Sequence, residues 1–183
     1  MENHSKANIE HALKWGIILG MANILLYLLV YLISKSSLTS WWLGTFSLAL
    51  NIFLLIIPVT IQRKEFGNEI TFNEAFLICF ITYAGGSLLQ TIFTYILYNF
   101  IDPGLSEYIK TKAIEMTQSM MEKFGAPQDS IEKTLEKMQL EDFRQTPARI
   151  ARQFLFMILF GGVISLILAA ILKRKPKNTD FAG

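Results

Sequence analysis

The side chains best suited to chemistry in this sequence are uncharged polar groups inside its third long apolar stretch. Their spacing places most of them along one face of a helix. Such a row either lines a polar groove or permeation path, or forms hydrogen bonds between helices, each worth about 0.6 kcal/mol on average in membranes. We favour the hydrogen-bonding interpretation and keep Gln90, Thr94 and Tyr98 as a candidate polar path. The full row is Tyr83, Ser87, Gln90, Thr91, Thr94, Tyr98 and Asn99.

No other group of residues offers a catalytic or metal-binding arrangement. His4 and His11 are seven residues apart, which on a helix separates them by about 10 Å along the axis, too far for one ion. Met116, Met120 and Met121 have the spacing of an apolar packing face rather than of a soft-metal site. No motif places a nucleophile beside a base. We therefore expect no metal, no cofactor and no enzymatic activity.

Ionisable groups are missing from the middle of every long apolar stretch. Asp, Glu, Lys, Arg or His inside a membrane usually marks a proton relay or ion-coupled transport. Their absence argues against a proton pump or antiporter. A passive path or a lipid-handling path remains compatible with the sequence.

The elements that must position these groups are four apolar stretches, at residues 15–33, 41–61, 75–101 and 154–172. A helix needs about 20 apolar residues to cross a bilayer. The chain is 52% apolar and 17% charged, below the roughly 25% charged residues of soluble domains. The pattern predicts an all-α integral membrane protein, one domain with four transmembrane helices. Its net charge of +2 and lack of a dense basic face exclude nucleic acid as an expected partner.

Basic residues predict the orientation. Lys and Arg concentrate in short cytoplasmic segments of membrane proteins. One side of the four stretches has eight such residues, while the short loop on the other side has only Lys35. We therefore expect both termini in the cytoplasm and the long segment between the third and fourth stretches outside. The eight residues are Lys6, Lys14, Arg63, Lys64, Lys173, Arg174, Lys175 and Lys177.

The long segment at residues 104–146 is predicted to form an amphipathic helical hairpin. Apolar residues recur at helical spacing from Leu105 to Phe124, and Gly125 suits the end of the first helix. Pro127 suits the first turn of a second helix that places Ile131, Leu135 and Met138 on one face. Thr146 and Pro147 predict the N-cap and first residue of the last helix. The apolar face of this hairpin suits either a protein partner or the membrane surface.

Small residues predict where helices approach closely. Gly16 and Gly20 form a GxxxG pattern, Gly85 and Gly86 lie in the third stretch, and Gly161 begins a four-residue repeat with Ser165 and Ala169. Packing within the four helices explains all three sets. Association through one of these faces is the alternative, and Gly16 and Gly20 are its candidate contact within the membrane.

The most distinctive local segment precedes the third stretch. Thr71 and Glu74 form a capping box, Ile70 can staple to Ala75, and Gly67 permits the preceding turn. This segment, the Asp102-Pro103 exit, the Met-containing loop and the basic tail together resemble a bacterial membrane family known as domain of unknown function 4199. The resemblance covers nearly the whole chain. It implies a bacterial inner-membrane location and no established activity, substrate or cofactor.

Two functional hypotheses follow. The first is a non-enzymatic membrane protein that associates through its helices with itself, another membrane protein or membrane lipid. Its candidate contacts are Gly16, Gly20, Met116, Met120 and Leu135. The second is a small transporter or channel subunit that works as an oligomer, with the candidate polar path along the third stretch. The sequence leaves the partner, any solute and the oligomeric state open.

Overall fold

The computed structural model describes the backbone of residues 2–174 and the side chains of residues 6–174. His4, Lys175 and Lys177 fall outside the described side chains. The described residues form helices and no strand, apart from an isolated bridge between Ile70 and Arg174. The elements are α1 (Glu2–Ile33), η1 (Lys35–Thr39), α2 (Trp41–Glu65), α3 (Phe72–Ile96), the π-helical turn η2 (Leu97–Ile101), α4 (Leu105–Lys123), α5 (Gln128–Leu140) and α6 (Pro147–Leu172).

Four helices, α1, α2, α3 and α6, are long and apolar enough to span a membrane. Large apolar side chains stay exposed along all of them, including Leu29, Phe53, Ile92 and Leu159 at 57%, 61%, 49% and 68% exposure. Soluble monomers rarely expose apolar patches above a few hundred Å². This surface therefore fits a multi-pass membrane protein, as the sequence predicted.

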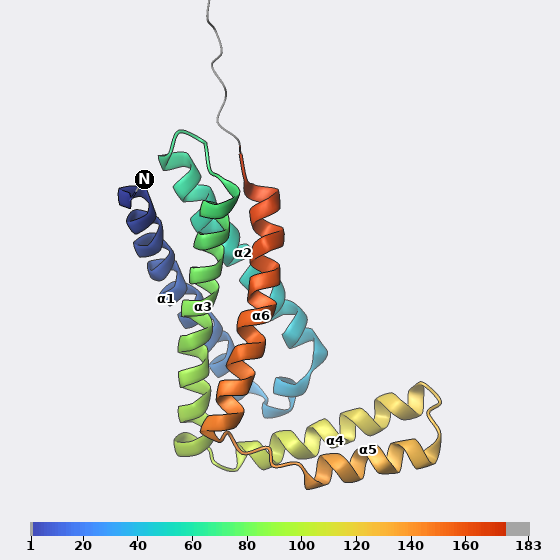
Figure 1. The fold of residues 1–183 in the computed structure, drawn as a ribbon. Coiled ribbons are helices and arrows are strands. Elements are labelled where there is room, and N and C mark those ends of the chain that lie inside the picture. Colours follow the sequence, from blue (N-terminus) through green and yellow to red (C-terminus); the bar gives the residue numbers. More distant parts are fainter. Residues whose placement is uncertain (1, 175–183) are drawn as a thin grey trace, which may run out of the picture.

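The central helix of the bundle is α3. It packs extensively against α1 and α6 and less against α2. Figure 1 shows α2 crossing the other three helices at an angle, so that its first half stands away from them near η1. The main buried cluster lies at the opposite end, where Leu55, Val59, Ile78 and Ala169 meet.

Close approach of α1 to α3 depends on glycine. A Cβ on Gly16 would lie 3.1 Å from the Thr82 carbonyl oxygen, and one on Gly20 would lie 2.9 Å from the side chain of Leu89. Both glycines are buried. In the described bundle this face is covered by α3 of the same chain. That Gly16 and Gly20 contact another molecule stays a prediction.

The contact between α3 and α6 is tighter still. A Cβ on Gly161 would fall 2.0 Å from the ring of Tyr83, a distance that no real side chain tolerates. Ser165 and Ala169, one and two turns on, are fully buried. The small-residue repeat of α6 thus packs internally, which agrees with the intramolecular interpretation of the sequence.

The ends of the helices follow the sequence signals closely. Thr71 Oγ1 accepts from Glu74 N–H while Glu74 accepts from Thr71 N–H, which completes the capping box. Thr146 caps α6, with Pro147 as its first residue. Gly67 and Gly125 both have φ +69° after their helices, the left-handed conformation that favours glycine at a helix end. The loop between α2 and α3 is shorter than the gap between the predicted stretches 41–61 and 75–101, because α2 continues to Glu65 and α3 begins at Phe72.

Candidate functional site

A mainly apolar cavity of about 270 Å³ lies between the first half of α2 and the other three long helices. Its residues all belong to the four candidate spans. Among the described residues that line it, none is acidic, basic or histidine. The cavity therefore offers neutral hydrogen-bonding groups within an apolar wall. Its polar members are Asn23, Tyr27, Ser47, Asn51, Tyr83, Ser87 and Gln90.

One wall of this cavity satisfies its own hydrogen bonds. Asn23 of α1 and Asn51 of α2 donate to each other's amide oxygens at 3.1 Å in both directions. Their remaining amide hydrogens reach the backbone, at Leu19 O and Ser47 O. Ser47 also donates to Asn23 Oδ1 at 3.4 Å. This pair acts as a clamp between α1 and α2 and has little capacity left for a ligand.

The α3 wall has unused capacity. Gln90 Oε1 is shielded from water and has no hydrogen-bond donor among the described residues. A buried polar group left without a partner costs about 1–3 kcal/mol. Ser87 lies one turn before Gln90 on the same wall. The cavity thus has a satisfied side and a side that a ligand could complete.

The three residues of the candidate polar path have different environments. Gln90 lines the cavity. Thr94 donates its hydroxyl to Gln90 O within the same helix at 2.9 Å, and Tyr98 is buried with its hydroxyl 2.7 Å from that of Tyr27. Only Gln90 is therefore placed to meet a ligand, and the described side chains do not join the three into one path.

The entrance to the α4–α5 hairpin is fixed by an ion pair. Asp102 accepts from Lys35 at 2.6 Å and from Tyr31 at 2.9 Å. These hydrogen bonds lower the pKa of Asp102, and the bond to Asp102 raises the pKa of Lys35. Just behind the pair, Leu105 is buried against Leu97 and Tyr98. The start of α4 is thus tied to both α1 and α3.

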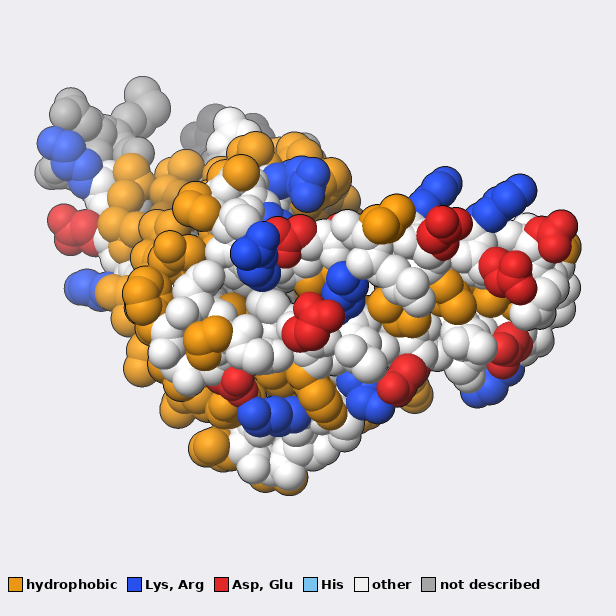
Figure 2. Space-filling view, turned by 90° about the horizontal axis from the view of Figure 1, so that it is seen from below, with side chains coloured by type: hydrophobic (Ala, Val, Ile, Leu, Met, Phe, Trp, Pro, Cys, Tyr) orange, Lys and Arg blue, Asp and Glu red, His pale blue; other side chains and the backbone are white. Residues whose placement is uncertain are grey.

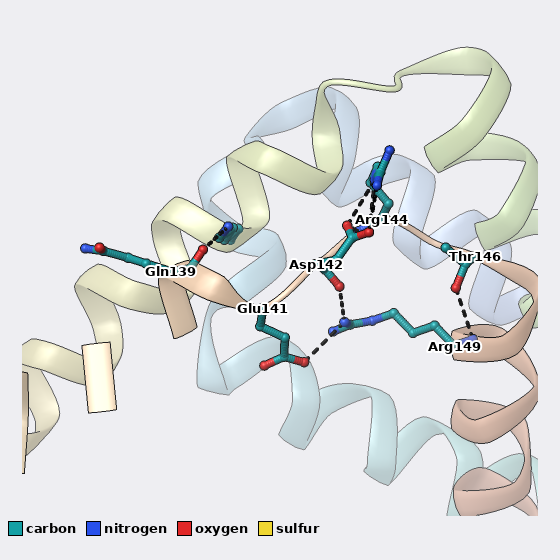
Figure 3. A network of polar contacts seen from close by, with 7 residues as sticks. Gln139, Glu141, Asp142, Arg144, Thr146 and Arg149 are labelled. Atoms are coloured by element: carbon teal, nitrogen blue, oxygen red, sulfur yellow. Dashed lines mark hydrogen bonds and ion pairs between the residues drawn. The ribbon is translucent and has the colours of Figure 1, made fainter. Parts of the chain in front are cut away.

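The exit from the hairpin is fixed by a second polar network (Figure 3). Arg149 of α6 reaches back to the Glu141 carboxylate at 3.2 Å and to the Asp142 carbonyl. Arg144 forms a bidentate pair with Asp142, which lowers the pKa of that carboxyl. Farther along, Asn99 of η2 donates to Gln145 O at 3.1 Å. Both ends of the hairpin are therefore held at a set angle to the bundle.

Figure 1 shows α4 and α5 extending sideways from the end of the bundle that contains η1. The two helices pack against each other, with Ile131 buried between them. Seen from below, Figure 2 shows Lys, Arg, Asp and Glu side chains spread over the face that points away from the bundle.

The opposite side of α4 has an apolar row. Met116 lines a depression with Trp41 and Trp42 at the start of α2, so it faces the bundle side, and the Lys112–Glu115 ion pair lies at the same depression. Met120 and Phe124 follow at four-residue spacing and therefore share this side. Met116, Met120 and Phe124 are 36%, 49% and 84% exposed, whereas Leu135, the third predicted hairpin contact, is only partly exposed.

The family described as "Protein of unknown function (DUF4199)" matches residues 14–174. The chain belongs to this family. The match confirms the resemblance inferred from the capping segment and the four-span layout. No curated protein and no solved structure was found to match the chain. The family description gives no activity, so function must be argued from the geometry.

Sequence reasoning about this DUF4199 protein missed the pairing of its polar groups. Asn23 and Asn51 each lie within a predicted span, but their mutual contact depends on how α1 and α2 cross. Tyr27 and Ser47 gave no signal because both types are common in membrane helices. The Lys35–Asp102 pair joins residues that are far apart in the chain, and charge alone did not predict that pairing.

Proposed function

We propose that this protein acts without catalysis, by association, and that its associating element is the α4–α5 hairpin seated on membrane lipid. The observation that carries the proposal is the exposed row of Met116, Met120 and Phe124 on the side of α4 that faces the bundle. Because α4 extends sideways from the bundle (Figure 1), it would lie along the membrane surface if the four long helices span the bilayer. Its bundle-facing side then meets the bilayer, as in interfacial amphipathic helices.

The charges of the hairpin support the same position. The polar face points away from the bundle (Figure 2), where water would lie. The apolar row continues from Trp41 and Trp42, which are 75% and 43% exposed and suit the aromatic belt at a membrane interface. The row is therefore continuous with the apolar surface of the spans.

The orientation we propose follows the basic residues. Figure 1 shows the start of α1, the end of α2 and the end of α6 at the end of the bundle opposite the hairpin. These parts of the helices and the residue after α6 contain Lys6, Lys14, Arg63, Lys64 and Lys173. By the positive-inside rule, that end is cytoplasmic. The hairpin then rests on the outer surface of what we take to be a bacterial inner membrane.

The alternative, a small transporter or channel subunit, has weaker support. Of its three candidate residues only Gln90 faces the cavity, while Thr94 and Tyr98 are engaged by helix and tyrosine partners. Flux of ions or small solutes through proteoliposomes that disappears in Gln90→Leu would favour it over association.

The test compares two double variants of the full chain in lipid nanodiscs by hydrogen exchange. Met116→Asp with Met120→Asp places charges in the apolar row, and we expect faster amide exchange in α4 and α5 with unchanged exchange in the spans. Thr111→Asp with Ser119→Asp adds the same charge to exposed polar positions of α4 and should leave the hairpin protected.

Equal exchange in the two double variants would contradict the lipid-seated hairpin. Native mass spectrometry adds a second check on the occupant. If the wild type is a dimer that only the Met→Asp variant dissociates, the occupant of the row is a second copy of the chain rather than lipid.

A further inference from the structure

The cavity between α2 and α3 has no role in the proposed association, and its chemistry points to a ligand of its own. We propose that it binds the headgroup of a neutral, hydroxyl-bearing lipid, such as a long-chain alcohol or a monoacylglycerol. The inference does not depend on where the hairpin lies. It is carried by the neutral lining, the unpartnered amide oxygen of Gln90 and the mouth of the cavity.

The lining selects against charge. Among the described residues around the cavity, none has an ionisable acidic, basic or histidine side chain, so none could form an ion pair with a carboxylate, a phosphate or an ammonium group. A charged headgroup without a partner would lose its hydration at a large cost in free energy. A hydroxyl loses far less and regains hydrogen bonds from amide and hydroxyl groups.

Gln90 supplies the recognition. Its Oε1 has no donor among the described residues, and the last torsion of a glutamine side chain rotates broadly. Because Oε1 is shielded from water in this conformer, the Gln90 side chain must turn about that torsion before a hydroxyl in the cavity can donate to the oxygen or accept from the amide nitrogen. Ser87 lies one turn away on the same wall. Asn23 and Asn51 are occupied with each other and keep the opposite wall in place.

The mouth opens toward lipid. Leu48 of α2 and Phe160 of α6 both line the cavity, yet they are 39% and 55% exposed. These lipid-facing side chains place the opening between α2 and α6. A volume of about 270 Å³ is at the low end for ligand pockets, so it suits a headgroup whose chain extends through this opening into the bilayer.

Gly44 offers a clean way to close the cavity. It lines the cavity, and a Cβ built on it meets no atom within 4 Å. A Gly44→Phe side chain would therefore fill the space without a backbone clash. Gly162 is a matched control on α6: its Cβ would meet only Phe80, at 3.8 Å, and it does not line the cavity.

The experiment photo-crosslinks the full chain in phosphatidylcholine nanodiscs with a long-chain alcohol that has a diazirine near its hydroxyl. Mass spectrometry should place the label on cavity residues of α2, α3 and α6, and unlabelled monoacylglycerol should compete. We expect Gly44→Phe to abolish this labelling, Gln90→Leu to weaken binding about 2- to 10-fold, as for one lost hydrogen bond, and Gly162→Phe to leave it unchanged.

Two outcomes would overturn the inference. One is labelling spread over the lipid-facing sides of α1 and α6 that Gly44→Phe does not change. The other is equal labelling by the matched fatty acid, whose carboxylate should be rejected. If Gly44→Phe does not fold, as judged by its thermal unfolding, Gln90→Leu decides the question, because an unchanged affinity in that variant would equally contradict the site.

Discussion

Glycine has opposite roles in two parts of this helix bundle. Where α3 meets α6, Gly161 leaves room for the ring of Tyr83, and any Cβ there would overlap the ring. In the first half of α2, Gly44 faces the cavity and has no neighbour within 4 Å of a built Cβ. The α1–α3–α6 part, with the second half of α2 packed against it, is thus a close-packed frame, while the first half of α2 stands beside an open space. We infer that the frame provides stability and that the loosely packed side provides binding.

The largest expected effect breaks the frame. Gly161→Ala would drive a methyl group into the Tyr83 ring, which is too rigid and buried to move aside without cost. Overpacking of this kind costs about 1–3 kcal/mol, occasionally more. Thermal unfolding of the purified protein in mild detergent measures it. Gly44→Ala is the control and should match or slightly exceed the wild type, since alanine favours helix over glycine by about 1 kcal/mol.

A smaller effect is expected at the clamp between the frame and the first half of α2. Asn51→Ala removes both hydrogen bonds to Asn23. Because interhelical hydrogen bonds in membranes average about 0.6 kcal/mol each, we expect a loss of about 1 kcal/mol in the same unfolding assay. Asn23→Ala with Asn51→Ala should then cost little more than either change alone. Fully additive losses would contradict the mutual pairing.

The smallest effect is expected outside the spans, at Asp102. Its pKa is lowered by Lys35 and Tyr31, so the bond stabilises the fold above the usual carboxyl pKa and is lost as the pH falls through the lowered one. Unfolding temperatures should therefore stay level from pH 7 to about 5 and fall below about pH 4. Asp102→Asn should be slightly less stable at pH 7 and should lose this part of the acid dependence. The same fall in unfolding temperature below about pH 4 in the wild type and in Asp102→Asn would contradict this role of Asp102.

Local signals in the sequence predicted local structure well. The capping box at Thr71, the glycine stops at Gly67 and Gly125, and the Thr146-Pro147 start of α6 each depend on residues within one helical turn. Hydropathy predicted the four long helices for a similar reason, because a span needs only length and composition.

Relations between distant segments were not predictable in the same way. Gly16 and Gly20 face α3 of the same chain, and nothing in a GxxxG pattern says which helix will cover it. The cavity depends on the angle at which α2 crosses the bundle, and the direction of the hairpin depends on the pairings of Asp102 and Arg149. These are tertiary contacts that a single sequence does not encode in any short pattern.

The most direct test of the account is the depth of α4 relative to the membrane. Cys79 is the only cysteine and is buried, so it is replaced by alanine, and a nitroxide label is placed at Met120 or at Gln118 in nanodiscs. We expect the label at Met120 to be accessible to oxygen and protected from a water-soluble nickel chelate, and the label at Gln118 to be exposed to the chelate. Equal exposure of both positions to the chelate would show that the hairpin stands in water and would contradict the lipid-seated position.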